Sequence, residues 1–291
     1  MNKPIAAIAF LALITGSAHA QTVPNTREYS RNGELSPGTQ APSIQGMISA
    51  IQSGSPENMR ATLEYGERVL CQECVPLLEN KLLSSSSPRV REIAAWWLRR
   101  QPFAGPAVRR TLTTIVTSDS SAERRARAAE ALGEFMEPHS LDALGTASKS
   151  DLDPTVRAAA VRALARLNAP GAGNLITAAL ADPVLAVRSA AVDVVLLVAG
   201  FQGFGPLLPL LADADAGLRA HVARVVGELR LTDATAPLTG LLMSDPSPSV
   251  RKSAAWALGR IGGAQAVLAA QKAKESDPLV LSAIAVAERM K

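Results

Sequence analysis

The side chains with the most reactive chemistry in this sequence are the two cysteines, Cys71 and Cys74, in the run Cys-Gln-Glu-Cys. We expect a helix to start near Val75, and a helix N-terminus lowers the pKa of a nearby thiol, so a pair at this spacing could exchange disulfides with a substrate. The same pair could form a structural disulfide that pins a turn in an oxidising compartment, or could stay as free thiols. We favour the structural disulfide.

Other reactive sites lack the residues they need. Covalent haem attachment requires a His after the second Cys, where Val75 stands, and a zinc site would need two further ligands besides the cysteines. Beyond the first twenty residues the only histidines are His139 and His221, and neither stands with a nucleophile and a carboxylate at a triad-like spacing. Three glycines mark a turn without the strand and Lys of a phosphate loop: Gly200, Gly203 and Gly205. We therefore predict no catalytic, cofactor-binding or metal-binding residues, and no enzyme activity.

The first twenty residues have the layout of a secretory signal peptide. Lys3 is followed by an apolar run over residues 5–14 and by small residues that end at Ala20, where we expect cleavage. Gln21 follows the cut, so the acylated Cys of a lipoprotein is missing. Residues 21–42 are rich in Pro, Thr, Ser, Asn and Gly and are predicted to be flexible. We expect a periplasmic, or alternatively secreted, protein without stable membrane insertion after cleavage.

Composition points to closely packed helices and gives little support for nucleic-acid binding. Hydrophobic residues make up 47% of the chain and aromatic residues only 3%, a balance that suits Ala- and Leu-rich helices. The formal net charge of +4 falls to about +3 once Lys3 is removed, which is too weak to indicate a polyanionic partner.

A repeat of about 32 residues organises the rest of the chain. An arginine recurs at intervals of 34, 32, 31, 31 and 32 residues, at Arg91, Arg125, Arg157, Arg188, Arg219 and Arg251. Six residues before the last five of these stands an aspartate, at Asp119, Asp151, Asp182, Asp213 and Asp245. A fixed period of this length is typical of solenoid proteins.

Each repeat contains two helical segments. After each Arg, apolar residues recur with helical spacing, and Pro often precedes the segment, as in a first helical turn. A shorter amphipathic segment comes before the Asp, at residues 75–83, 108–116, 175–180, 207–211 and 238–243. One helix pair cannot cover its own apolar face, but stacked pairs share a core. The prediction is an all-α fold, an α-solenoid of about seven to eight antiparallel helix pairs over residues 43–291.

The repeats resemble HEAT repeats, in particular the short type similar to those associated with phycobilisome lyases. The resemblance is carried by residues 245–259, Asp-Pro-Ser-Pro-Ser-Val-Arg-Lys-Ser-Ala-Ala-Trp-Ala-Leu-Gly, and by residues 151–165. It implies that the recurring Asp and Arg form an internal structural ladder, in which a carboxylate at the turn accepts hydrogen bonds from the following helix or from an Arg. The last unit departs from the pattern, with Glu275 at the Asp position and Leu281 at the Arg position.

One stripe of each second helix, at one, five and nine residues after the Arg, is expected to face outward. In HEAT-like solenoids the second helices line the concave side, and Trp and Arg are typical of protein-binding hot spots. The candidate partner-binding residues are Trp96, Arg100, Arg162, Arg166, Arg224, Trp256 and Arg260. Alternatively, Trp96 and Trp256 cover the edges of the core and the charges form only a solvated face.

Residues 192–204 are apolar almost all round the predicted helix. The stretch is either buried on more sides than its neighbours or exposes an apolar patch for a partner, and we favour burial.

These patterns lead to a main hypothesis and two alternatives. The main hypothesis is a non-catalytic periplasmic scaffold or adaptor that binds a protein or peptide of the cell envelope on its concave face, without a cofactor and without nucleic acid. The first alternative is a thiol-redox or lyase-like accessory protein that acts through Cys71 and Cys74 or a bound tetrapyrrole. The second is a spacer whose partners contact its ends.

Overall fold

The computed structural model describes residues 41–198, 201 and 203–290. The predicted signal peptide, nearly all of the predicted flexible segment and Gly200 lie outside these residues. The described part contains fifteen α-helices and three short 3-10 helices, without strands, and residues 42–291 form one compact unit. The predicted all-α solenoid is confirmed. None of the described helices is long and apolar enough to cross a bilayer.

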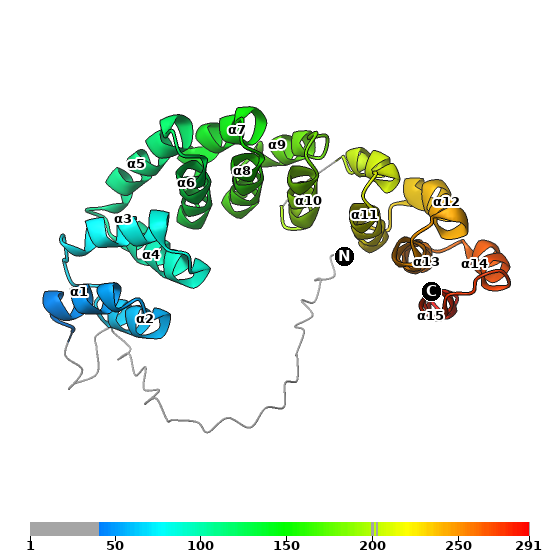
Figure 1. Cartoon of the computed structure of the whole chain (residues 1–291), viewed down its shortest axis with the longest axis horizontal. Coiled ribbons are helices and arrows are strands. Elements are labelled where there is room, and N and C mark those ends of the chain that lie inside the picture. The colour runs from blue at the N-terminus through cyan, green and yellow to red at the C-terminus, as the bar shows by residue number, and fades with distance from the viewer. Residues whose placement is uncertain (1–40, 199–200, 202, 291) are drawn as a thin grey trace, which may run out of the picture. The chain divides into compact units, whose positions relative to one another are not determined.

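Eight helix pairs follow one another along the chain (Figure 1). The pairs are α1 (Ile44–Ser53) with α2 (Pro56–Tyr65), α3 (Cys74–Ser84) with α4 (Pro88–Arg100), α5 (Gly105–Ser118) with α6 (Ala122–Phe135), α7 (Leu141–Ser150) with α8 (Pro154–Leu167), α9 (Ala172–Ala179) with α10 (Leu185–Val194), the 3-10 helix η2 (Gly205–Ala212) with α11 (Ala216–Glu228), α12 (Thr235–Ser244) with α13 (Pro248–Ile261), and α14 (Gln265–Lys272) with α15 (Pro278–Ala287). Two further 3-10 turns, η1 (Pro138–Ser140) and η3 (Thr232–Ala234), lead into α7 and α12.

The second helices of the pairs contact one another in sequence, from α2 through α4, α6, α8, α10, α11 and α13 to α15. We call this row the second-helix layer, and the row formed by the first members of the pairs the first-helix layer (Figure 1). Buried Leu, Ile, Val and Ala side chains fill the space between the two layers and form one continuous core. No pair covers its own apolar face, so each repeat is stabilised by its neighbours.

In most repeats a side-chain cap at the start of the second helix fixes the tight turn between the two helices. Ser121 accepts the backbone N–H of Arg124 at the start of α6, and Asp215 accepts that of Leu218 at the start of α11. Such caps satisfy helix donors that have no partner within the helix, and each is worth about 1 kcal/mol.

Glycine allows close contact between neighbouring second helices. A Cβ atom at Gly133 of α6 would lie 2.8 Å from the Cα atom of Ala163 in α8, and Gly227 of α11 stands in the same relation to Ala257 of α13. No side chain fits at these two positions without moving the helices apart, so a recurring small residue sets the spacing of the layer.

The structure differs from the expected helices in two places. The segment expected over residues 207–211 is the 3-10 helix η2, which has Pro209 inside it, and a proline cannot donate the hydrogen bond that an α-helix needs there. The helix α7 does not stand out in the sequence, because its buried residues are the small Ala143, Gly145, Ala147 and Ser148 together with Leu144.

In the apolar stretch over residues 192–204, five of the ten described residues are buried. Val192, Val195 and Phe201 are among its buried residues, whereas Leu196 and Leu197 are 49% and 68% exposed. α10 ends at Val194, and it contacts α11 over a much shorter stretch than α6 contacts α8. The junction between α10 and α11 is therefore the most open one within the second-helix layer.

Candidate partner-binding groove and the arginine ladder

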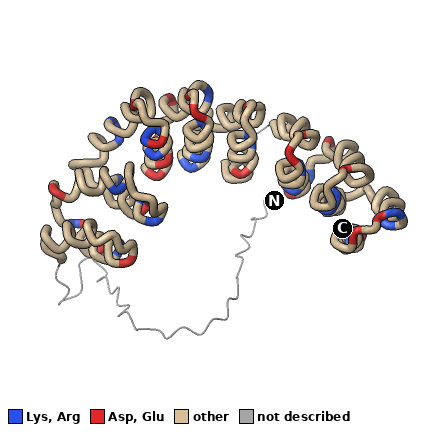
Figure 2. Tube along the Cα trace, viewed as in Figure 1, with Lys and Arg blue, Asp and Glu red and all other residues tan. Residues whose placement is uncertain are grey.

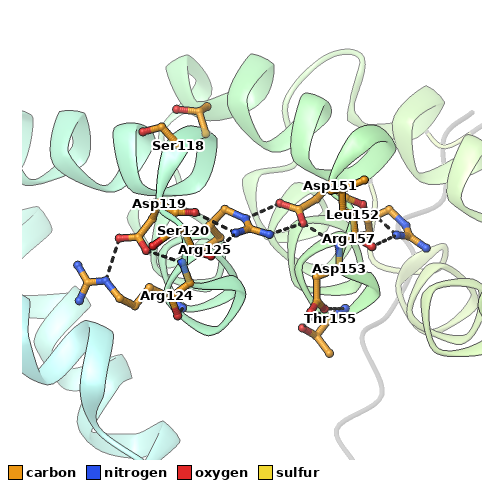
Figure 3. Close-up of polar contacts among 12 residues, drawn as sticks. Ser118, Asp119, Ser120, Arg124, Arg125, Asp151, Leu152, Asp153, Thr155 and Arg157 are labelled. Atoms are coloured by element: carbon orange, nitrogen blue, oxygen red, sulfur yellow. Dashed lines mark hydrogen bonds and ion pairs between the residues drawn. The ribbon is translucent and has the colours of Figure 1, made fainter.

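The recurring arginines bridge consecutive repeats (Figure 3). Nη1 of Arg125 donates to the backbone carbonyl of Asp119 in its own repeat at 2.9 Å. Its Nε and Nη2 donate to the two carboxylate oxygens of Asp151 in the next repeat, at 2.7 and 2.8 Å. Asp151 Oδ1 also accepts the backbone N–H of Asp153 at 2.9 Å, which fixes the turn before α8. One Arg thus joins two turns through a bidentate contact.

The same geometry recurs at the four following junctions. Nε of each arginine lies 2.8 Å from a carboxylate oxygen of the next repeat, in the pairs Arg157–Asp182, Arg188–Asp213, Arg219–Asp245 and Arg251–Glu275. In the last repeat Glu275 therefore accepts the hydrogen bonds that an aspartate accepts in the other repeats. The series ends there, since Leu281 stands in the place of the next arginine.

The first junction departs from this pattern. Nη2 of Arg91 donates to Glu130 on α6 at 3.1 Å, and Nε of Arg124 donates to Asp119 at 2.9 Å. Asp119, the candidate acceptor of this junction, is thus bound within its own repeat. We call the five regular contacts, from Arg125–Asp151 to Arg251–Glu275, the arginine ladder.

The carboxylates of the ladder are buried and stay ionised. The side chains of Asp245 and Glu275 are 4% and 3% exposed. Burial raises the pKa of Asp245, but the hydrogen bonds from Arg219 and from the Ser247 N–H outweigh it, and the pKa lies below its ordinary value. The hydrogen bond from Arg251 lowers the pKa of Glu275 to about 2. These donors and acceptors hold repeats together and are occupied within the chain.

Cys71 and Cys74 form a disulfide at the start of α3, with their Cα atoms 5.3 Å apart. Both residues are completely buried. A substrate thiol must reach a sulfur to exchange with it, and burial blocks that approach in the folded protein. The bond therefore pins the turn between α2 and α3.

Neither histidine belongs to a cluster that could hold a metal, and the part of the chain described contains no group of three or more His, Cys, Asp or Glu side chains with that geometry. His139 Nδ1 lies 2.5 Å from Glu137 on an exposed turn. His221 Nδ1 lies 3.4 Å from Asp193 Oδ1, and burial lowers the pKa of His221.

A groove of about 570 Å³ crosses the second-helix layer between α4, α6 and α8. Its floor consists of the small residues Ala131, Ala159 and Ala163, and Leu82 and Pro88 lie at one side. Its other lining residues are charged: Arg91, Glu92, Arg127, Glu130, Glu134, Arg162 and Arg166. Figure 2 shows basic and acidic residues together on α6 and basic residues on α8.

Of the seven candidate partner-binding residues, Arg162 and Arg166 line this groove. Neither Trp96 nor Trp256 lines this groove. Arg127 lines it but was missed in the sequence. It stands two residues after Arg125, and at about 100° per residue that position lies within roughly 60° of the position five residues after the Arg. The helical angle could have identified it.

The two tryptophans pack at the edge of the core beneath arginines. The guanidinium groups of Arg60 and Arg100 lie 4.4 and 5.4 Å from the ring centroid of Trp96, and that of Arg260 lies 5.7 Å from the ring of Trp256. Both rings are half-buried against the core. Cation–π contacts of this kind stabilise a surface by about 0.5–1 kcal/mol. The geometry matches the alternative in which these rings cover core edges.

Most charges of the groove are paired with an opposite charge. Glu130 contacts Arg91 at 3.1 Å and Arg127 at 3.6 Å, and Glu134 contacts Arg166. Arg162 is exposed on α8 and has no ion pair among the described residues, and the same holds for Arg224 on α11. Arg100 and Arg260, further along the layer, pair with Glu67 and Glu228.

Family comparison agrees with this architecture. The HEAT-repeat model matches residues 44–133, 75–151, 109–195 and 205–287, which together include most of the chain. The chain belongs to the HEAT-repeat family. HEAT repeats typically mediate protein interaction, and the family match shows a scaffold fold. None of the curated proteins matches the sequence significantly.

Comparison with solved structures gives matches at low sequence identity. The chain is similar to Escherichia coli YibA, with 18% identity, a TM-score of 0.54 and coverage of 85% of this chain and 93% of that one. It also resembles human deoxyhypusine hydroxylase, with 21% identity, a TM-score of 0.36 and coverage of 85% and 96%. The complex of CpcE and CpcF of phycocyanin lyase from Nostoc matches with 18% identity, a TM-score of 0.40 and coverage of 75% and 94%.

These neighbours correct one prediction. The sequence led us to expect that the chain is not an enzyme, but its structural neighbours include deoxyhypusine hydroxylase, which is an enzyme, and subunits of phycocyanin lyase. The prediction of no enzyme activity rested on the repeat fold and on the lack of a recognisable triad, and it is therefore wrong. At 18–21% identity these likenesses assign no activity to this chain.

Proposed function

We propose that this protein is a periplasmic HEAT-repeat scaffold that holds a segment of another envelope protein in the groove across α4, α6 and α8. The observation that carries the proposal is the groove itself, about 570 Å³ in volume and formed by three consecutive repeats. Its lining side chains come from separate helices that the solenoid holds at fixed spacing, and a rigid charged surface of this kind suits recognition of another chain.

Two observations support the periplasm as the place of action. The first twenty residues have a basic start, a short apolar run and a small-residue cleavage pattern. The buried disulfide between Cys71 and Cys74 is the kind of bond that persists in oxidising compartments. The proposal predicts a mature chain that starts at Gln21 and is recovered in the periplasmic fraction. A chain that keeps its first twenty residues in the cytosol would contradict it.

In vivo photo-crosslinking tests the binding face. A photoreactive amino acid replaces Arg162 in the groove or, as a matched control, Arg110, an exposed arginine of α5 in the first-helix layer that has no ion pair among the described residues. We expect a discrete crosslinked partner from position 162 and none from position 110. Equal crosslinking from both positions, or none from position 162, would refute this binding face.

A further inference from the structure

We infer that the groove recognises an extended peptide segment through an aspartate or glutamate side chain that pairs with Arg162. The inference rests on the proposed function and adds the chemistry of the bound segment. It starts from the state of Arg162, which lies five residues after the ladder arginine of α8, is exposed and has no ion pair in the described part of the chain.

Arg162 is the one charge in the groove lining that is not neutralised by an opposite charge among the described residues. The others pair as Arg91 with Glu130, Arg127 with Glu130, Arg166 with Glu134, and Glu92 with Arg89. The acid at the equivalent position of the next repeat, Asp193, lies against His221. The neighbouring carboxylates are therefore engaged, and Arg162 retains a full complement of donors for a ligand.

The floor beside Arg162 leaves room for such a ligand. Ala159 and Ala163 flank Arg162 along α8, and Ala131 faces them from α6. All three are buried, so the groove is deepened where its side chains are smallest. A carboxylate that enters there meets a planar guanidinium, which can donate two parallel hydrogen bonds to its two oxygens.

The fixed acids of the groove favour a single negative charge over a more highly charged group. Glu92, Glu130 and Glu134 all line the groove that contains Arg162. With the four arginines of the lining, Arg91, Arg127, Arg162 and Arg166, these three acids leave a net charge of +1, which a single carboxylate balances and a phosphate dianion exceeds. A carboxylate therefore fits the balance of charge better than a phosphorylated side chain or a nucleic-acid backbone.

The length of the groove indicates a chain segment. It involves three neighbouring second helices, and packed helices lie about 8–10 Å apart. Two such steps span roughly 16–20 Å, which corresponds to about five or six residues of extended chain. A segment of this length can place one acidic side chain at Arg162 while its other residues contact α4 and α6.

Synthetic peptide pools test the inference with the mature, disulfide-bonded protein. Fluorescent seven-residue peptides are randomised except at the central residue, which is Asp, Glu, Asn, Lys or phosphoserine, and binding is measured by anisotropy. We expect the Asp and Glu pools to bind about tenfold more tightly than the Asn pool, as a charge-assisted hydrogen bond implies. Arg162→Gln should reduce this preference to less than about twofold, and Arg162→Lys should retain part of it. Arg110→Gln should leave it unchanged.

Each contrary outcome overturns a defined part of the argument. Equal binding of the Asp and Asn pools, or a preference that survives in Arg162→Gln, would overturn recognition of a carboxylate by Arg162. Tighter binding of the phosphoserine pool would assign the groove to phosphopeptides instead. Either result would leave the proposed function standing if position 162 still crosslinks to a partner in cells. Absence of both peptide binding and crosslinking would remove the proposed function together with this inference.

Discussion

The junction between α6 and α8 and the junction between α10 and α11 belong to the same ladder but differ in packing. At the first, Gly133 lets α6 lie directly against Ala163 of α8. At the second, the equivalent position, eight residues after the ladder arginine, is Leu196, and the two helices contact only briefly. A leucine side chain cannot occupy a position where even a Cβ is crowded. Arg188 still reaches Asp213 across this junction.

This difference separates two functions of the repeat sequence. The Arg and the carboxylate connect the turns, and their contact persists whether or not the second helices pack closely. The small residue eight positions after the Arg sets how closely those helices approach. The first property orders the repeats, and the second sets the width of the second-helix layer at each step.

The largest expected effect comes from removing the ladder contact at the open junction between α10 and α11. Arg188→Leu removes the donor to the buried Asp213 and should cost about 3 kcal/mol, the scale expected when one partner of a buried pair is removed. Because little helix packing remains at this junction, urea unfolding followed by circular dichroism should split into two transitions. Arg157→Leu, the control, should cost a similar amount and keep a single transition, since α8 and α10 pack along their length. A single transition in Arg188→Leu would show that the open junction is not the weak one.

A smaller effect is expected from changing the spacing residue. Gly227→Leu places a side chain where a Cβ would already lie 2.8 Å from Ala257, so the free energy of unfolding should fall by about 2 kcal/mol through overpacking. The matched change at the open junction, Leu196→Gly, should cost less than about 1 kcal/mol, because Leu196 is 49% exposed. Urea midpoints at constant m-value measure both. Equal losses would refute the link between this position and the packing distance.

A further prediction concerns the pH dependence of the ladder. Glu275 has its pKa lowered from 4.5 to about 2 by Arg251, so the folded state binds fewer protons than the unfolded state. Its stabilising contribution is therefore complete above about pH 4.5 and is lost as the pH falls towards 2. Glu275→Gln should make the urea midpoint less dependent on pH in this range than it is in the unchanged protein. An unchanged pH dependence would show that Glu275 does not contribute this linkage.

The fold can be predicted well from the sequence because the residues that recur with the repeat have strong local structural preferences. The Arg and Asp series, the prolines at helix starts and the apolar stripes define each helix pair without reference to its neighbours. The function of Glu275 in the ladder was harder to foresee, since its longer side chain reaches Arg251 only in the folded geometry.

The candidate binding surface could be predicted only in part. Helical spacing correctly places Arg162 and Arg166 on the outward face of α8, but the spacing cannot tell which stripes meet in one groove. That outcome depends on contacts between repeats, such as the pairing of Glu134 with Arg166. The tryptophans illustrate the limit, because Trp96 is covered by Arg60, a residue of the preceding repeat that the stripe does not include.

The ladder also gives the array a direction. Every regular repeat supplies a guanidinium to the next repeat and a carboxylate to the preceding one. The repeats are therefore joined head to tail by the same contact. Deleting or duplicating one complete repeat would again place an arginine next to a carboxylate at the new junction. The number of repeats in the chain can therefore change by whole repeats of about 32 residues without requiring a new type of interface.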